Sequence, residues 1–132
     1  MNAYACILLP FPPTVNNLFV NSRRTGGRFP SKSYTAWQAE AALALAQQNY
    51  PAMKGPVSIV FTFGRPDRRR RDVFNYVKAP EDLLVKHGVI EDDSLVEHGV
   101  VQWSEHVIGV RIEIESVAAR LARVEQAARL VS

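Results

Sequence analysis

The chain has little cysteine and no long apolar run. Its one cysteine among 132 residues, Cys6, excludes a disulfide within the chain, and no Cys/His spacing matches a zinc site. We predict that Cys6 is a small buried residue of the apolar stretch 5–9. Prolines interrupt this stretch, no basic segment precedes it, and no apolar run could span a bilayer, which argues against a signal peptide or membrane contact. We therefore expect a soluble cytoplasmic protein.

The net charge of the chain is small, but its positive charges are unevenly distributed. The net charge is +3 with an isoelectric point near 9.3, and five of the sixteen Lys and Arg residues lie between Arg65 and Arg71. Such a local patch indicates a polyanionic partner. Hydrophobic residues make up 47% of the chain, so it should fold, and its length favours one domain, 1–132.

The apolar pattern predicts an α/β (α+β) fold. Strands are expected at 4–9, 57–63, 95–103 and 106–115, and the last two should form a hairpin that turns near Ser104 and Glu105. Inward positions of the last strand should include Ile108. Helices are expected from a cap at Ser31 or Ser33 to about Asn49, then at 72–86 and 117–131. Pro80 should kink the second of these helices or restart it at a first-turn position. The segment 16–30 is expected to be a mobile basic loop. The order predicts a mixed β-sheet covered by helices, with 116–132 as an additional C-terminal helix.

The candidate chemistry lies where a basic run meets carboxylates. Arg68, Arg69, Arg70 and Arg71 lead directly into Asp72, and Asp92 and Asp93 follow about one helix later. Hydrolysis of a phosphodiester with a metal ion needs carboxylates for the metal and cations for the flanking phosphates. Lys78 lies on the same helical face as Asp72 and can pair with a phosphate oxygen or the leaving group. Other interpretations remain open: Asp72 as a helix cap, the two later aspartates as a solvated turn, and the arginines as a loose anion-binding loop.

These residues also resemble a known family. The segment 66–73, with Asn75, Lys78, 82–84, 88–89 and 92–93, resembles the signature of the RusA family of Holliday junction resolvases. The segment 9–14, with Asn16 and Asn17, resembles the N-terminal part of that family. The resemblance runs from about Tyr4 to Glu115 and leaves the C-terminal helix uncovered.

The resemblance implies a RusA-like fold and a small homodimeric endonuclease of bacteria or their phages. It would cut four-way DNA junctions by paired nicks in DNA recombination and repair, with Mg²⁺ (Mn²⁺ possible) and no organic cofactor. The metal-binding carboxylates of the family correspond to Asp72 and Asp93, with Asp92 as the neighbouring acid, and its functional lysine corresponds to Lys78. The candidate DNA contacts are Arg68, Arg69, Arg70, Arg71, Lys78, Asn75, Arg23 and Arg24.

One residue departs from the family pattern. The family usually has Asp-x-Asp-Asn, whereas this chain has Phe74 at the second acidic position. A phenyl ring cannot bind Mg²⁺, so three explanations are open. The site can work with Asp72, Asp93 and either Asp92 or Asp82; Asn75 can supply a neutral oxygen; or the protein binds junctions without cutting them. We expect Phe74 to lie in the core, with a wedge at an unstacked DNA step as the alternative.

Overall fold

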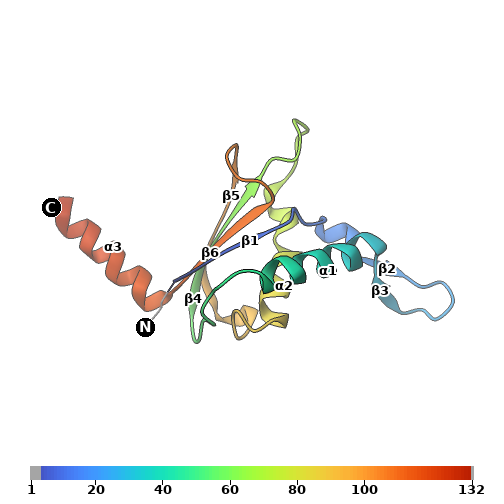
Figure 1. Ribbon diagram of the computed structural model, residues 1–132, viewed down its shortest axis with the longest axis horizontal. Helices are drawn as coiled ribbons and strands as arrows, with labels where there is room; N and C mark the ends of the chain where they lie inside the picture. The colour runs from blue at the N-terminus through green and yellow to red at the C-terminus, as the bar shows by residue number, and fades with distance from the viewer. Residues whose placement is uncertain (1–3, 132) are drawn as a thin grey trace.

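The computed structural model describes residues 4–131, so Ser132 of the expected C-terminal extension lies outside the described range. The α/β class is confirmed (Figure 1). The helices and strands follow the chain in this order: β1 (Tyr4–Leu9), the 3₁₀ helix η1 (Val15–Asn17), β2 (Phe19–Asn21), β3 (Arg28–Pro30), α1 (Lys32–Ala46), β4 (Val57–Gly64), the 3₁₀ helix η2 (Val73–Tyr76), α2 (Lys78–Lys86), the 3₁₀ helix η3 (Asp93–Leu95), β5 (Val96–Ser104), β6 (Val110–Ser116) and α3 (Val117–Val131). Within this described part of the chain, no helix has the length and apolar character needed to cross a membrane.

A mixed four-stranded sheet in the order β1-β6-β4-β5 organises the chain. Strand β6 lies antiparallel between β1 and β4, whereas β5 runs parallel to β4. The expected hairpin between the last two strands is wrong, because β4 lies between them. Strand β4 is buried at all but one of its positions, the pattern of a central strand, so it takes the middle of the sheet.

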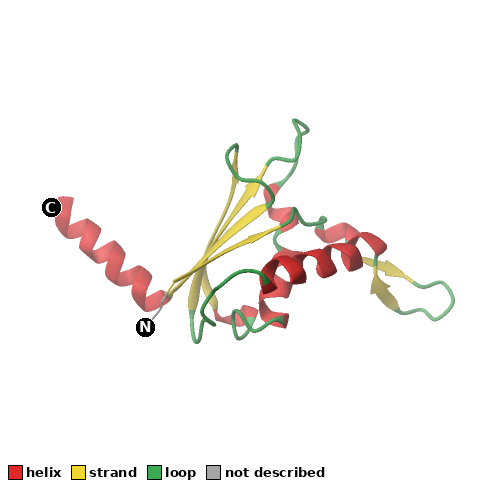
Figure 2. Ribbon diagram, in the orientation of Figure 1, coloured by secondary structure: helices red, strands yellow, loops and turns green. Residues whose placement is uncertain are grey.

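One face of the sheet carries the core. The inward residues of β6, which are Val110, Ile112 and Ile114, are fully buried. Helices α1 and α2 cover this face (Figure 2), and they contribute Trp37 and Leu84 among others. Burial of each large apolar side chain stabilises the fold by about 1.5–3 kcal/mol. The expected extension of the inward pattern to Ile108 is wrong: this residue is 97% exposed, because β6 begins only after the turn there.

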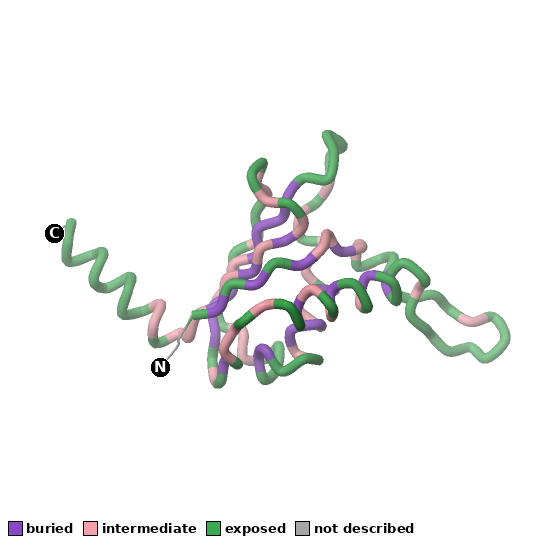
Figure 3. Tube along the Cα trace, viewed as in Figure 1, coloured by how far each residue is buried: buried purple, intermediate pink, exposed green. Residues whose placement is uncertain are grey.

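The opposite face of the sheet is not covered by α1 or α2. Strand β1 alternates strictly, so Ala5 and Ile7 point into the core and Cys6 points away from it. The predicted burial of Cys6 is therefore wrong, since its side chain is exposed. Helix α3 leaves the end of β6 and stands apart from the body, exposed along most of its length (Figure 3).

Three further predictions concern the segments around α1 and α2. The segment 16–30 contains a two-stranded hairpin, β2 paired with β3, rather than only a loop. The segment 72–86 is divided into η2 and α2, which confirms the expected restart of the helix: Pro80 has no N–H to bond the carbonyl of Tyr76 and lies in the first turn of α2. The expected cap of α1 is confirmed, since the Ser31 hydroxyl accepts a hydrogen bond from the backbone N–H of Tyr34 at 3.1 Å.

Candidate functional site

The basic loop, defined here as 65–72, follows the C-terminal end of β4. Its shape depends on Arg71, whose side chain is only 20% exposed and which bonds both the Asp67 carboxylate and the Tyr76 hydroxyl. These bonds from Arg71, with one from the backbone N–H of Arg69, lower the pKa of Asp67 to about 2. Arg71 and Asp67 therefore fix the shape of the loop.

The other arginines of the run are turned toward solvent. Arg69 pairs with Asp67 at 3.3 Å, but its side chain remains 76% exposed, and such exposed pairs contribute at most about 1 kcal/mol. Arg68 and Arg70 are exposed and form no ion pair with any residue in the described range 4–131. The run thus supplies three accessible cations and one structural arginine.

The base of the basic loop packs against aromatic side chains. The guanidinium of Arg65 lies 5.0 Å from the ring centre of Trp103 and also pairs with Glu105. Trp103 belongs to a group of packed aromatic rings that includes Phe63 and Tyr76. The bond from Arg71 to Tyr76 therefore ties the loop to this aromatic group.

Asp72 ends the basic loop and begins η2. Its carboxylate accepts a hydrogen bond from the backbone N–H of Phe74 at 3.1 Å, so the interpretation of Asp72 as a helix cap is confirmed. The expected core position of Phe74 is wrong, because its side chain is 70% exposed. In a 3₁₀ helix a residue and the second residue after it lie on different sides, and here the buried side is taken by Tyr76.

A group of charged side chains surrounds the start of α2. The Nζ atom of Lys78 lies 3.1 Å from Asp82, and this hydrogen bond raises the pKa of Lys78, with a further contribution from Asp93. Burial raises the pKa of Glu81, and the negative charge of Asp93 raises it further. The structure thus brings Lys78, Glu81, Asp82 and Asp93 into electrostatic contact.

Helix α1 closes one side of this charged group. The ring of Tyr34 is 4% exposed, and burial raises the pKa of its hydroxyl, with a smaller contribution from the charge of Asp82. Asn75 is half-buried within η2. The charged group is therefore partly shielded from water on the side of α1, which strengthens the interactions among its charges.

The remaining predicted ligand has a local role. Asp92 caps η3, since its carboxylate accepts bonds from the backbone N–H and the hydroxyl of Ser94, and these bonds lower its pKa. Across residues 4–131, no three His, Cys, Asp or Glu side chains form a group that could hold a metal ion. The Asp72 carboxylate accepts a hydrogen bond from Phe74, whereas Asp93 interacts electrostatically with Lys78 and Glu81 of α2.

The carboxylates nevertheless fit a magnesium ion by their chemistry. Mg²⁺ takes oxygen ligands and is usually held by one or two carboxylates, with water and substrate phosphates completing its shell. Asp93 with Asp72 or Glu81 provides donors of this kind. Glu81 was not predicted from the sequence, although its place just after Pro80, in the first turn of α2, is one where an acidic side chain is favoured.

Arg23 and Arg24 lie elsewhere. They are exposed at the tip of the β2–β3 hairpin, where the backbone N–H of Ser22 bonds the carbonyl of Gly27 and the N–H of Gly26 bonds the carbonyl of Ser22. The hairpin projects from the body in a different direction from the basic loop (Figure 1). The two predicted basic segments are therefore separate surfaces of the molecule.

These features define a class: an α/β protein with a mixed sheet, an exposed arginine loop and carboxylates at the start of the following helix. Comparison with known protein families gives a match over residues 10–115 to the model described as Endodeoxyribonuclease RusA. The match ends before α3. Because it covers most of the chain, the protein belongs to the RusA family.

Relatives from bacteria and phage agree with this assignment. The chain is 34% identical over 115 residues to the crossover junction endodeoxyribonuclease RusA of Escherichia coli K12, covering 86% of this chain and 93% of the relative. The enzyme of the same name from Enterobacteria phage 82 shows the same identity and coverage. The one from Aquifex aeolicus is 34% identical over 88 residues, which cover 65% of this chain and 67% of the relative.

Proposed function

We propose that the protein is a metal-dependent endonuclease that cuts four-way DNA junctions as a homodimer. The observation that carries the proposal is the placement of exposed Arg68 and Arg70 directly before Asp72, with Lys78 and Asp93 together at the start of α2. The names of the bacterial and phage relatives support the substrate class. We also propose that the protein acts in DNA recombination and repair in the cytoplasm of a bacterial host.

The residues divide the work of phosphodiester hydrolysis. Arg68, Arg69 and Arg70 hold phosphates that flank the scissile bond. Asp93, with Asp72, would hold the metal ion, which when bound lowers the pKa of the attacking water and neutralises charge on the phosphate. Lys78 is protonated near neutral pH, since the ordinary pKa of lysine lies far above 7 and Asp82 raises it further, and its ammonium can bond a phosphate oxygen.

A dimer fits the substrate. A four-way junction has approximate two-fold symmetry, so each of two subunits related by a two-fold axis can cut one of two equivalent strands. Each subunit would then contribute one basic loop and one set of carboxylates. Arg23 and Arg24, at the separate hairpin tip, would contact phosphates farther along an arm of the junction.

A second candidate is a junction-binding protein that does not cut. The exposed ring of Phe74, at a position where the family usually has a carboxylate, favours this reading. Such a ring next to a phosphate-binding loop can insert at an unstacked base step. Under this candidate Asp72 and Asp93 remain as neighbours of the DNA without holding a productive metal ion.

A cleavage assay with synthetic four-way junctions separates the two candidates. Junctions labelled on each strand are incubated with the protein over a range of Mg²⁺ and Mn²⁺ concentrations, with linear duplex of the same sequence as the control. Symmetric nicks in the junction alone support the nuclease. Tight junction binding with no nicks at any metal concentration supports the non-cutting candidate and overturns the first.

A further inference from the structure

Helix α3 is the part of the structure that the proposed site does not use. It begins after the segment matched by the family model, and its side chains from Leu121 to Val131 are all exposed. Leu121, Val124 and Val131 are 49%, 44% and 88% exposed. A single helix of 15 residues is marginally stable in water unless its apolar side packs against something. The structure therefore leaves an apolar surface that needs a partner.

The apolar residues of α3 follow a heptad repeat. Their spacing is four, three, four and three residues, which places them in one narrow stripe along the helix, the a/d seam of a coiled coil. The residues of this seam are Val117, Leu121, Val124, Ala128 and Val131. Leu130 is apolar but lies off the seam, on the opposite side of the helix.

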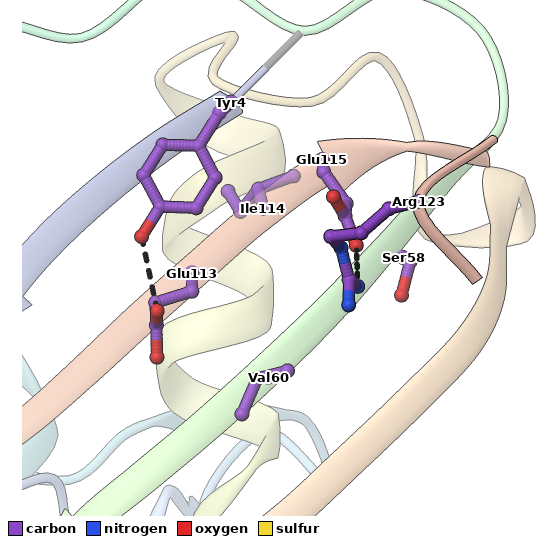
Figure 4. Close-up of a pocket in the computed structure, with 7 residues that line it drawn as sticks. All are labelled: Tyr4, Ser58, Val60, Glu113, Ile114, Glu115 and Arg123. Atoms are coloured by element: carbon purple, nitrogen blue, oxygen red, sulfur yellow. Dashed lines mark hydrogen bonds and ion pairs between the residues drawn. The ribbon is translucent and has the colours of Figure 1, made fainter. Parts of the chain in front are cut away.

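The other side of α3 is attached to its own subunit. Arg123 is off the seam and bonds the carboxylate of Glu115 on the uncovered face of the sheet (Figure 4). This contact lies beside Ser58 and Val60 of β4 in the same pocket. Because Arg123 turns one side of the helix toward the sheet, the seam is directed elsewhere and stays accessible.

We propose that α3 pairs in parallel with α3 of a second copy of this chain. The charges beside the seam favour this occupant, since Arg120 and Glu125 occupy the flanking g and e positions of the repeat. A parallel two-fold pair sets Arg120 of each copy against Glu125 of the other. An antiparallel pair would instead set these two charges near Ala127 and Ala118. The seam is thus complementary to itself in the parallel orientation.

A hollow at the foot of α3 continues the seam. It has a volume of about 410 Å³, and its lining includes Pro56, Val117 and Leu121, with Lys54 and Glu97 at the same place. Side chains from a second copy can enter it when the two helices lie side by side. In a parallel pair both bodies lie at the same end of helices about 22 Å long, so one two-fold axis relates two active sites.

The test compares two matched variants of the full-length protein by sedimentation equilibrium and light scattering. Val124→Glu places a charge in the seam on both copies, and we expect its dimer dissociation constant to rise by about 100-fold. Leu130→Glu makes the same change at an 80% exposed position off the seam, and it should stay within about threefold of the unmodified protein. Thermal melting checks that both variants fold.

A charge exchange tests the orientation. Arg120→Glu should weaken the dimer several-fold, and adding Glu125→Arg to the same chain should restore it. Failure of the double variant to recover overturns the parallel pairing. A Val124→Glu dimer as tight as that of the unmodified protein overturns the role of α3, as does an unmodified protein that remains monomeric.

The inference rests on the proposed homodimer but not on catalysis. If the unmodified protein dimerises through α3 and makes no nicks, the nuclease proposal fails and the α3 interface stands. If the α3 variants lose junction binding without any change in dimer dissociation, α3 contacts DNA instead, which overturns the interface.

Discussion

The basic loop and the charged group at the start of α2 are built in opposite ways. In the loop, one arginine fixes the backbone and three more are exposed, so we expect that no single exposed arginine is essential for the proposed phosphate contacts. In the charged group, each carboxylate has different neighbours. Nearby, Phe74 takes the position where the family usually has a further aspartate. DNA binding should therefore tolerate substitution, whereas metal binding should depend on one or two residues.

The largest difference between the two regions should appear at Asp93. We expect Asp93→Asn to reduce cutting by at least about 100-fold, since even residues one step removed from a metal ion typically cost 10–100-fold. Junction affinity should stay the same or rise, because a negative charge near phosphate is removed. Gel-shift and cleavage assays on the same preparation measure both quantities.

Asp92 provides the matched control for that change. Asp92→Asn keeps the cap of η3, since asparagine caps helices as well as aspartate does, and it should lower cutting by less than about tenfold. Equal losses in both variants would show that Asp92 shares the metal. Unchanged cutting by Asp93→Asn would exclude Asp93 as a ligand.

The second change restores a carboxylate to the acidic region. We expect Phe74→Asp to raise cutting by about tenfold, since it adds a hard oxygen ligand two residues after Asp72. Phe74→Asn is the control, because it matches the size of aspartate without the charge. If both variants cut no better and both lose junction affinity, the exposed ring acts as a wedge in DNA rather than as a replaced ligand.

The third change separates the two kinds of arginine in the basic loop. Replacing Arg68 and Arg70 with alanine should reduce the slope of log affinity against log salt by about 1.8, since each lost phosphate contact contributes about 0.9. The melting temperature should not change. Arg71→Ala should instead lower the melting temperature, because Asp67 and Tyr76 lose their shared partner. A salt slope that responds equally to all three arginines would contradict this division.

The sequence predicted most elements but not all of their neighbours. The alternation of 110–115 and the apolar run 57–63 located β6 and β4, because burial on one face or on both leaves a local pattern. The pairing of β5 with β4 rather than with β6 was not predicted. It depends on the chain crossing from one side of β4 to the other between β5 and β6, which no local pattern specifies. The exposure of Phe74 was also not predicted, because which side of η2 faces the core depends on how Tyr76 packs against Trp103, far along the chain.

The candidate site shows the same limit. The residues of the basic run and the aspartates were found from their types and order alone. The different roles of the four adjacent arginines were not predicted, because they depend on which arginine reaches Asp67 and Tyr76 in the folded chain. Glu81 was missed because its proximity to Asp93 depends on how the chain after α2 returns to the first turn of that helix.

The smallest expected effect concerns Glu81 and depends on pH. Burial raises the pKa of this carboxyl group above its ordinary value of 4.5, so ionisation is harder in the folded state than in the unfolded state. The folded state then loses stability as the pH rises from about 4.5 through the raised value. Glu81→Gln removes that loss and should raise the melting temperature by about 2 °C at pH 8, with no gain at pH 4.

The same substitution shows whether Glu81 has a function. If the half-buried Glu81 only destabilises the fold, Glu81→Gln should be more stable and should cut at the same rate. If Glu81 helps Asp93 hold the metal ion, Glu81→Gln should be more stable and yet cut about tenfold more slowly. Glu91→Gln, outside the charged group, should change neither the cutting rate nor the dependence of melting on pH in this way. A stable and fully active Glu81→Gln variant would leave Asp72 as the remaining partner for Asp93.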